Sequence, residues 1–205
     1  MNQKLLLIAF VPLLIFYGCS NDEMSPKMEE TGSYVYTIDG DNSAWEYLTS
    51  EETAIPPLAM MRNGNSAHTH GDFDLGATIA VWSGTQNDGG THGSATLTIQ
   101  TRTFTLETEC VMVEGNEAVY GGTITAIEGF GFPPIDVGDI AYFKVFDNGQ
   151  SNNAPADQVN GLIRFSKVSQ CDIWTPGSGA WPEELFPGFS LIVDIPEPGS
   201  AKVNN

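Results

Sequence analysis

Apolar and polar positions alternate with a period of two along most of the chain from Ala67 onward. Ala95, Leu97 and Ile99 lie on one side of such a segment, and the polar residues between them lie on the other. This alternation is typical of an antiparallel sheet that has one face in the core and one face in water. Glycine-rich turns separate the segments. We therefore predict an all-β fold, a single antiparallel β-barrel or sandwich of about 8–10 strands with little helix.

The stretch before Ala67 is less regular. Residues 34–38 are rich in aromatic and β-branched side chains and form the first predicted strand. Residues 43–66 show no periodicity, and only Ala44 to Glu52 is compatible with a short helical turn. Residues 34–205 are therefore expected to form one β-domain.

Residues 1–18 have the pattern of a secretory signal peptide. Lys4 is their only charge, and an apolar run over residues 5–17 follows it. This run is shorter than the roughly 20 apolar residues of a membrane-spanning helix. The residues Phe16-Tyr17-Gly18-Cys19 resemble a bacterial lipobox, in which the cysteine is lipidated and becomes the mature N-terminus. A plain secretory signal followed by a chance cysteine is the alternative.

We accordingly predict that Cys19 is lipidated and that the lipid bilayer is a partner of the protein. The residues Ser20-Asn21-Asp22-Glu23 resemble the surface-export signal of lipoproteins from Bacteroidota-type bacteria. An outer-membrane lipoprotein is therefore expected, and this second signal favours exposure at the cell surface. Residues 19–33 are polar and aperiodic, which predicts a flexible tether.

The net charge is strongly negative. Removal of residues 1–18, which carry one lysine, changes it from −18 to −19. Such a surface repels phosphate backbones, so we expect no nucleic-acid partner.

Cys110 and Cys171 are the two cysteines of the predicted domain. Phe104, Leu106 and Met112 lie on the apolar side of their segment, and the alternation places Cys110 on that same side. We therefore expect Cys110 to be buried in the core. In an oxidising compartment the two thiols can form one intramolecular disulfide, with two buried free thiols as the alternative.

The three histidines lie within 25 residues of one another. In an extended segment, His68, His70 and Asp72 project from one face because alternate residues do so. If His92 begins the strand that pairs with this segment, it lies beside them. Three imidazoles with a carboxylate suit Zn²⁺ or Cu²⁺. A coincidental pair of histidines on a solvated face is the alternative.

Two loops are rich in side chains with oxygen atoms, which are the ligands that Ca²⁺ prefers. The first contains Asp39 and Asp41, and the second runs from Asp147 to Asp157. The first does not have the residue spacing of an EF-hand. Asx and Gly residues also form tight turns for backbone reasons, so a turn is the alternative at both places.

A later segment is rich in aromatic side chains, including Trp174 and Trp181. Indole faces can stack on sugars, or they can cover the end of a core. Both interpretations stay open.

Catalytic signatures are missing from the sequence, which has no Gly-x-Ser-x-Gly, P-loop or His-Glu-x-x-His pattern. Glu107 and Glu109 share the polar side of a strand, where a solvated pair is the ordinary arrangement. We therefore expect a binding role in preference to an enzymatic one, with no required cofactor and with Zn²⁺ or Ca²⁺ as alternatives.

Two motifs in the centre of the chain suggest a family. Residues 110–118 have the pattern Cys-x-x-Val-x-Gly-Asn-x-Ala, and residues 147–157 have the pattern Asp-Asn-Gly…Ala-Pro-x-Asp. Together they resemble a group of secreted bacterial β-domains of uncharacterised activity, over about residues 67–171. The resemblance implies export and a β fold, and it implies no catalytic residue.

The sequence thus predicts a lipid-anchored β-domain of the outer membrane that acts as a binding or envelope-associated module. A glycan or an envelope protein is the expected ligand. The alternative is a metal-dependent enzyme or metal-binding protein that uses the three histidines.

Overall fold

The computed structural model describes residues 32–39, 43–48, 66–149, 154–171, 192–197 and 199–204. Within these ranges all regular secondary structure is strand, and no helix is present. The strands are β1 (Ser33–Thr37), β2 (Ala44–Leu48), β3 (Ala67–Asp74), β4 (Thr78–Asn87), β5 (Gly90–Ile99), β6 (Arg102–Glu114), β7 (Glu117–Glu128), β8 (Ile140–Phe146), β9 (Gln158–Asn160), β10 (Leu162–Ser166), β11 (Ile192–Asp194) and β12 (Ser200–Asn204).

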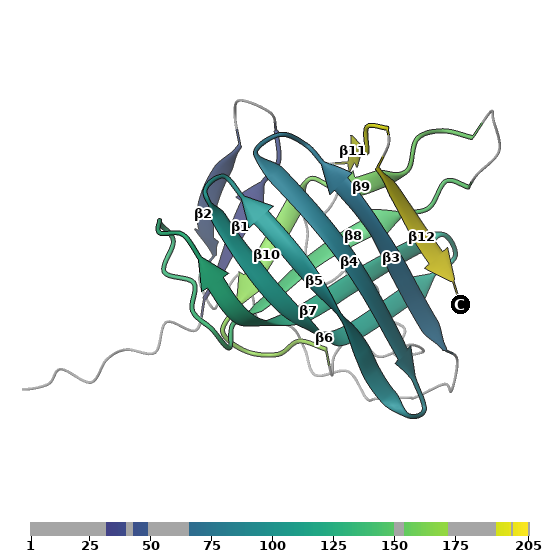
Figure 1. Ribbon diagram of the computed structural model, residues 1–205, viewed down its shortest axis with the longest axis horizontal. Coiled ribbons are helices and arrows are strands. Elements are labelled where there is room, and N and C mark those ends of the chain that lie inside the picture. Colours follow the sequence, from purple (N-terminus) through teal and green to yellow (C-terminus); the bar gives the residue numbers. More distant parts are fainter. Residues whose placement is uncertain are drawn as a thin grey trace, which may run out of the picture.

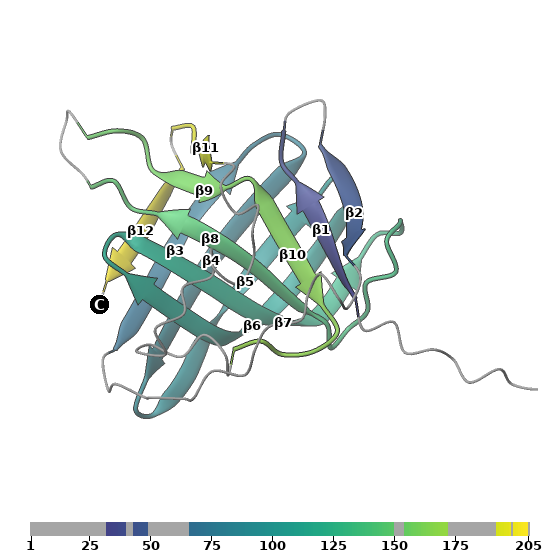
Figure 2. The same ribbon diagram turned by 180° about the vertical axis from the view of Figure 1, so that it is seen from behind.

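All strands belong to one antiparallel sheet with the order β12-β3-β4-β5-β6-β7-β8-β10-β1-β2, while β9 pairs with β8 and β11. Figure 1 shows β3, β4 and β5 in front of β7, β8 and β10, and the two sets of strands cross steeply; Figure 2 shows the same layers from behind. The sheet thus folds over onto itself. The all-β prediction is confirmed, with 12 strands in a sheet that is not closed.

The two layers enclose the main core. Ala95, Leu97 and Ile99 are at most 4% exposed, as their alternation predicts. Aromatic rings fill the space between the layers: Tyr120 stacks on Phe143 with ring centroids 5.1 Å apart. Such pairs stabilise a core beyond the area that they bury.

Residues 44–48 form a strand, so the prediction of a short helical turn there is wrong. β2 pairs with β1, and Trp45 packs against the rings of Tyr36 at 4.9 Å and Phe165 at 5.4 Å. The Phe165 ring comes from β10, far away in the sequence, and tertiary packing of this kind overrides local propensity.

The face on which Cys110 lies is also different from the prediction. Phe104 and Leu106 are in the main core, but Cys110 and Met112 belong to a second apolar cluster on the opposite side of the sheet. The register of β6 against β7 shifts between Thr108 and Cys110. A β-bulge places one extra residue in a strand, and side chains beyond it therefore change faces.

The extra residue of this bulge is Glu109, whose carboxylate accepts a hydrogen bond from the Thr123 hydroxyl at 2.8 Å. Beyond it Cys110 remains buried, at 6% exposure. The predicted disulfide is confirmed, since Cys110 and Cys171 are bonded across 61 positions of sequence. The bond therefore fastens the segment after β10 to the outer side of the sheet.

The second apolar cluster packs closely because position 121 is a glycine. A Cβ at this position would lie 2.7 Å from the Tyr142 ring and 2.8 Å from the Cys110 Sγ. Contacts this short are not tolerated, so only glycine leaves room for both neighbours. Above it, the Tyr142 hydroxyl accepts a hydrogen bond from the Gln170 N–H at 2.9 Å. Burial raises the pKa of the Tyr142 phenol, which stays protonated.

Among the described residues, no helix has the length and apolar character needed to cross a membrane.

Candidate functional site

Two of the predicted metal ligands meet on the outer face of β3. Phe73 is 1% exposed on the inner face, so His68, His70 and Asp72 project outward, as their parity predicts. The Nε2 of His68 lies 2.9 Å from the Nδ1 of His70. A hydrogen bond between two ring nitrogens requires one to donate and the other to accept, so at least one imidazole is neutral.

The neighbouring strand orients this pair. The Nδ1 of His68 lies 2.7 Å from the Thr85 hydroxyl of β4, which is its directly paired residue. A hydroxyl can donate or accept, so it fits either tautomer of the ring. The result is a polar chain from Thr85 through His68 to His70 on an accessible surface.

His92 shares this face but lies farther away. It pairs with Thr85 on one side of β4, and His68 pairs with Thr85 on the other. β4 thus separates the two histidine-bearing strands by about 9.5 Å, twice the spacing of neighbouring strands. In the part of the chain that the structure describes, no three His, Cys, Asp or Glu residues are grouped closely enough to hold a metal ion. The structure unites His68 with His70, but not with His92 or Asp72.

The first calcium-like loop is described only in part. The N–H of Asp39 donates to the Ser43 hydroxyl at 3.0 Å, which is a local turn. Asp41 lies outside the described residues.

In the second loop, Asp157 holds the free edge of β12. Its Oδ1 accepts the N–H of Asn148 at 2.8 Å, and its Oδ2 accepts the N–H of Ala201 at 2.9 Å. β12 pairs with β3 along one edge only, so its other N–H groups need different acceptors. Asp157 supplies one of them.

Asp147 acts in the same way two residues farther along β12. Its Oδ2 accepts the N–H of Val203 at 3.1 Å, and its Oδ1 accepts the N–H of Gly149 at 2.9 Å. Lys202 adds a positive charge 3.8 Å away. The four carboxylate oxygens of Asp147 and Asp157 therefore each accept a backbone N–H group, and the two residues together form what we call the edge clamp.

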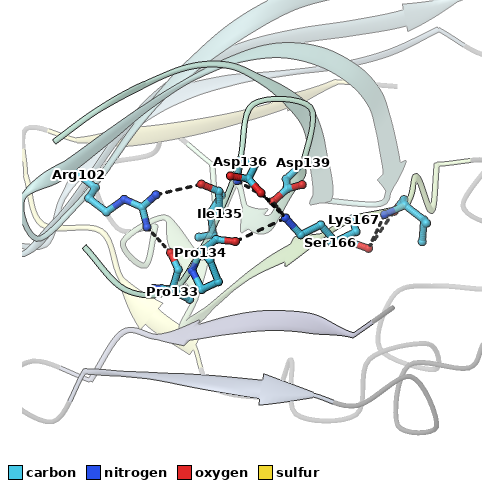
Figure 3. A network of polar contacts seen from close by, with 9 residues as sticks. Arg102, Pro133, Pro134, Ile135, Asp136, Asp139, Ser166 and Lys167 are labelled. Atoms are coloured by element: carbon cyan, nitrogen blue, oxygen red, sulfur yellow. Dashed lines mark hydrogen bonds and ion pairs between the residues drawn. The ribbon is translucent and has the colours of Figure 1, made fainter. Parts of the chain in front are cut away.

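Arg102, a buried residue at the start of β6, holds the loop between β7 and β8 (Figure 3). Its Nη1 donates to the carbonyl oxygens of Pro133 at 2.6 Å and Gly131 at 3.3 Å. Its Nη2 donates to that of Ile135 at 3.2 Å. Burial lowers the pKa of Arg102, while the charge of Asp136 acts in the opposite direction. Three carbonyls on one guanidinium fix the loop backbone.

Lys167 holds the other side of the same loop (Figure 3). Its Nζ lies 3.0 Å from the Asp136 carboxylate and 2.9 Å from that of Asp139. Burial lowers the pKa of Lys167, but the hydrogen bonds and negative charges of Asp139 and Asp136 outweigh this effect and raise it overall. Lys167 thereby balances the negative charge beside the loop.

Around this loop, large apolar side chains are exposed, and we call them the apolar rim. They are Phe130 (97% exposed), Phe132 (70%), Val137 (62%), Val168 (57%) and Tyr47 (39%). They make up five of the eight large hydrophobic residues that are exposed in the described ranges. The Tyr34 ring connects part of the rim, 6.0 Å from Phe132 and 5.0 Å from Tyr47.

The sequence pattern does not identify this rim, because Gly129 to Gly131 reads only as a turn. The available signal in the sequence is a pair of phenylalanines, Phe130 and Phe132, placed among glycines and a proline in this turn. Cys19, Trp174 and Trp181 lie outside the described residues, so their predicted roles stay predictions.

Comparison with protein-family models, with curated proteins and with solved structures finds no match to this chain. Fold and local geometry therefore define the protein only as an all-β, disulfide-bonded domain.

Proposed function

We propose that the protein is a lipid-anchored module of the outer membrane that binds a glycan or another envelope component. The observation that carries the proposal is the apolar leader that ends in Gly18-Cys19, followed after a short polar segment by β1 at Ser33. A diacylglyceryl-modified cysteine anchors a protein to a bilayer through its acyl chains, at about 0.8 kcal/mol per buried CH₂. The domain is then held close to the envelope surface.

The charged groups of the edge clamp and of the β7–β8 loop have structural roles, which supports a binding role over a catalytic one. The edge clamp consumes two carboxylates in backbone hydrogen bonds, and Arg102 and Lys167 fix a loop. These groups thus have structural roles. Trp174 and Trp181 motivate the choice of ligand, because indole faces stack on sugar rings.

The Cys19→Ser substitution tests the anchor. We expect it to abolish incorporation of labelled fatty acid and to move the protein out of the outer-membrane fraction. Trp181→Ala, with Trp174→Ala beside it, tests the ligand on a glycan array with purified protein, and we expect loss of the bound spots. Unchanged fractionation contradicts the anchor. An array profile that the substitutions leave unchanged removes the tryptophans from the proposal, and an array without bound spots for the unaltered protein removes the glycan.

A second candidate is metal binding at His68 and His70, which the 2.9 Å approach of their ring nitrogens favours. Two imidazoles on one tetrahedral Zn²⁺ have nitrogens about 3.3 Å apart, given bond lengths of about 2.0–2.1 Å. The pair is therefore close to the spacing that an ion requires. Water molecules would complete the coordination of Zn²⁺ or Cu²⁺.

Titration calorimetry with Zn²⁺ or Cu²⁺ tests this candidate on chelator-treated protein. We expect about one equivalent to bind, and His70→Ala to abolish the heat, because one remaining imidazole is a poor ligand set. His92→Ala is the matched control and should bind as the unaltered protein does. No binding to the unaltered protein ends the candidate, and equal loss in the His92 variant contradicts a site made by the pair.

A further inference from the structure

The apolar rim is unusual for the surface of a domain with this charge. Scattered apolar residues are ordinary on protein surfaces, but gathered ones indicate a surface that contacts something else. Phe130, at 97% exposure, has no packing role in the domain. The Tyr34 ring links Phe132 to Tyr47, and Lys167, next to Val168, binds the loop itself. The rim residues therefore lie on the β7–β8 loop or on segments that contact it.

The rim is presented from a fixed backbone. Arg102 binds three carbonyl oxygens of the β7–β8 loop, and Figure 3 shows two of them, those of Pro133 and Ile135. Lys167 binds Asp136 and Asp139 from the opposite side. A loop held in this way keeps its phenylalanines exposed instead of folding them onto the core. Little conformational entropy is then lost when the loop contacts an apolar phase.

The place of the rim relative to the start of the domain identifies the partner. Figures 1 and 2 both show the beginning of β1 beside the β7–β8 loop. Tyr34, the second residue of β1, contacts both Phe132 and Tyr47. The end of the domain that follows the predicted anchor is therefore the end that carries the rim.

The connecting segment is short. The 13 residues from Cys19 to Thr31 span at most about 45 Å when fully extended, and roughly 20 Å as a random coil. With Cys19 in the bilayer, the beginning of β1 is the part of the domain tethered nearest to the membrane surface. The rim lies at that same end.

We propose that the apolar rim is a second membrane contact, which seats the domain on the bilayer that holds its lipid anchor. This inference rests on the proposed anchoring of Cys19. Phe130, Phe132 and Val137 insert at the boundary between headgroups and acyl chains, as the apolar faces of peripheral membrane proteins do. Among the described residues of this end of the domain, Lys167 is paired with Asp136 and Asp139 and is not available to anionic headgroups. Contact with neutral lipid headgroups is therefore expected.

The test supplies the anchor chemically, so that it does not depend on lipidation in the cell. The mature chain, residues 19–205, is coupled through the Cys19 thiol to maleimide-phosphatidylethanolamine in phosphatidylcholine vesicles. The other two cysteines are joined to each other and do not react. Hydrogen–deuterium exchange is then compared between coupled protein and free protein. We expect exchange over residues 129–138 to slow by about tenfold or more, the effect of burying one Phe side chain.

Matched variants separate the rim from general crowding at the vesicle surface. Phe130→Ser and Val137→Ser should remove the protection, because both side chains are highly exposed and neither is needed for folding. Val81→Ser is the control, since Val81 is 57% exposed on the outer face of β4, away from the rim. The β4–β5 turn at residues 87–90 should exchange equally with and without vesicles.

Three results overturn the proposal. One is unchanged exchange over residues 129–138 on vesicles, and another is equal protection in the Phe130 and Val81 variants. The third is protection on native envelope membranes but not on pure lipid, which assigns the rim to a protein partner. Each of these is independent of the Cys19→Ser fractionation experiment, so failure of the rim proposal is distinguishable from failure of the anchor.

Discussion

Removal of the Cys110–Cys171 disulfide is expected to lower the free energy of unfolding by about 4 kcal/mol. The bond closes a loop across 61 positions of sequence, and in the chain-entropy model a loop of that length contributes about this much by restricting the unfolded state. The native contacts around the bond change little, because Cys110 and Cys171 occupy a small cluster outside the main core. The effect should therefore appear in stability and leave the fold unchanged.

The measurement is urea unfolding of the Cys110→Ala/Cys171→Ala double variant. Unaltered protein in reducing agent is the matched control and should lose a similar amount, since reduction removes the same bond without changing side-chain packing otherwise. A double variant within about 1 kcal/mol of the oxidised protein contradicts the prediction and indicates strong residual structure in the unfolded chain.

Replacement of Asp157 by alanine is expected to cost about 3 kcal/mol, the loss of two hydrogen bonds to a charged acceptor at about 1.5 kcal/mol each. One of these bonds secures the N–H of Ala201 on the free edge of β12, and the other secures the N–H of Asn148. Without this carboxylate, the end of β12 around Ala201 keeps only its pairing with β3, while Asp147 still accepts the N–H of Val203. Fraying should therefore begin at this strand.

Urea unfolding measures the loss, and hydrogen exchange at Ala201 locates it. Asp157→Asn keeps one carbonyl oxygen and should lose about half as much as alanine. Asp88→Ala, an exposed aspartate in the β4–β5 turn, is the control and should stay within about 0.5 kcal/mol of the unaltered protein. Equal stability of the Asp88 and Asp157 variants is incompatible with a clamp. A melting temperature that rises with millimolar Ca²⁺ would show that the loop also serves as the predicted cation site.

Sequence alternation was sufficient wherever a strand is regular. The period of two determines that Ala95, Leu97 and Ile99 face the core, and that His68 and His70 project together from β3. Side-chain direction in a strand depends only on parity, which is a local property. The partners in the disulfide were also predictable, because the predicted domain contains two cysteines and each therefore has one possible intramolecular partner.

The alternation of faces along β6 breaks at a β-bulge that the sequence of this strand does not reveal. Glu109 is the extra residue of a bulge, so Cys110 lies on the opposite face from Phe104 and Leu106. The bulge exists only in relation to β7, and a pattern along one strand contains no information about the register of its neighbour. The predicted face of Cys110 was wrong for this reason, although its burial was right.

The sites depend still more on the tertiary structure. β4 lies between β3 and β5, and it separates His92 from His68. Asp147 and Asp157 resemble cation ligands in sequence, yet their carboxylates accept N–H groups from residues 56 and 44 positions later. The sequence by itself determined the fold class, the pairing of the cysteines and the faces of the regular strands, because each follows from local periodicity or counting. Only the tertiary structure decided which side chains meet, since strand order, register and edges are set by contacts between distant segments.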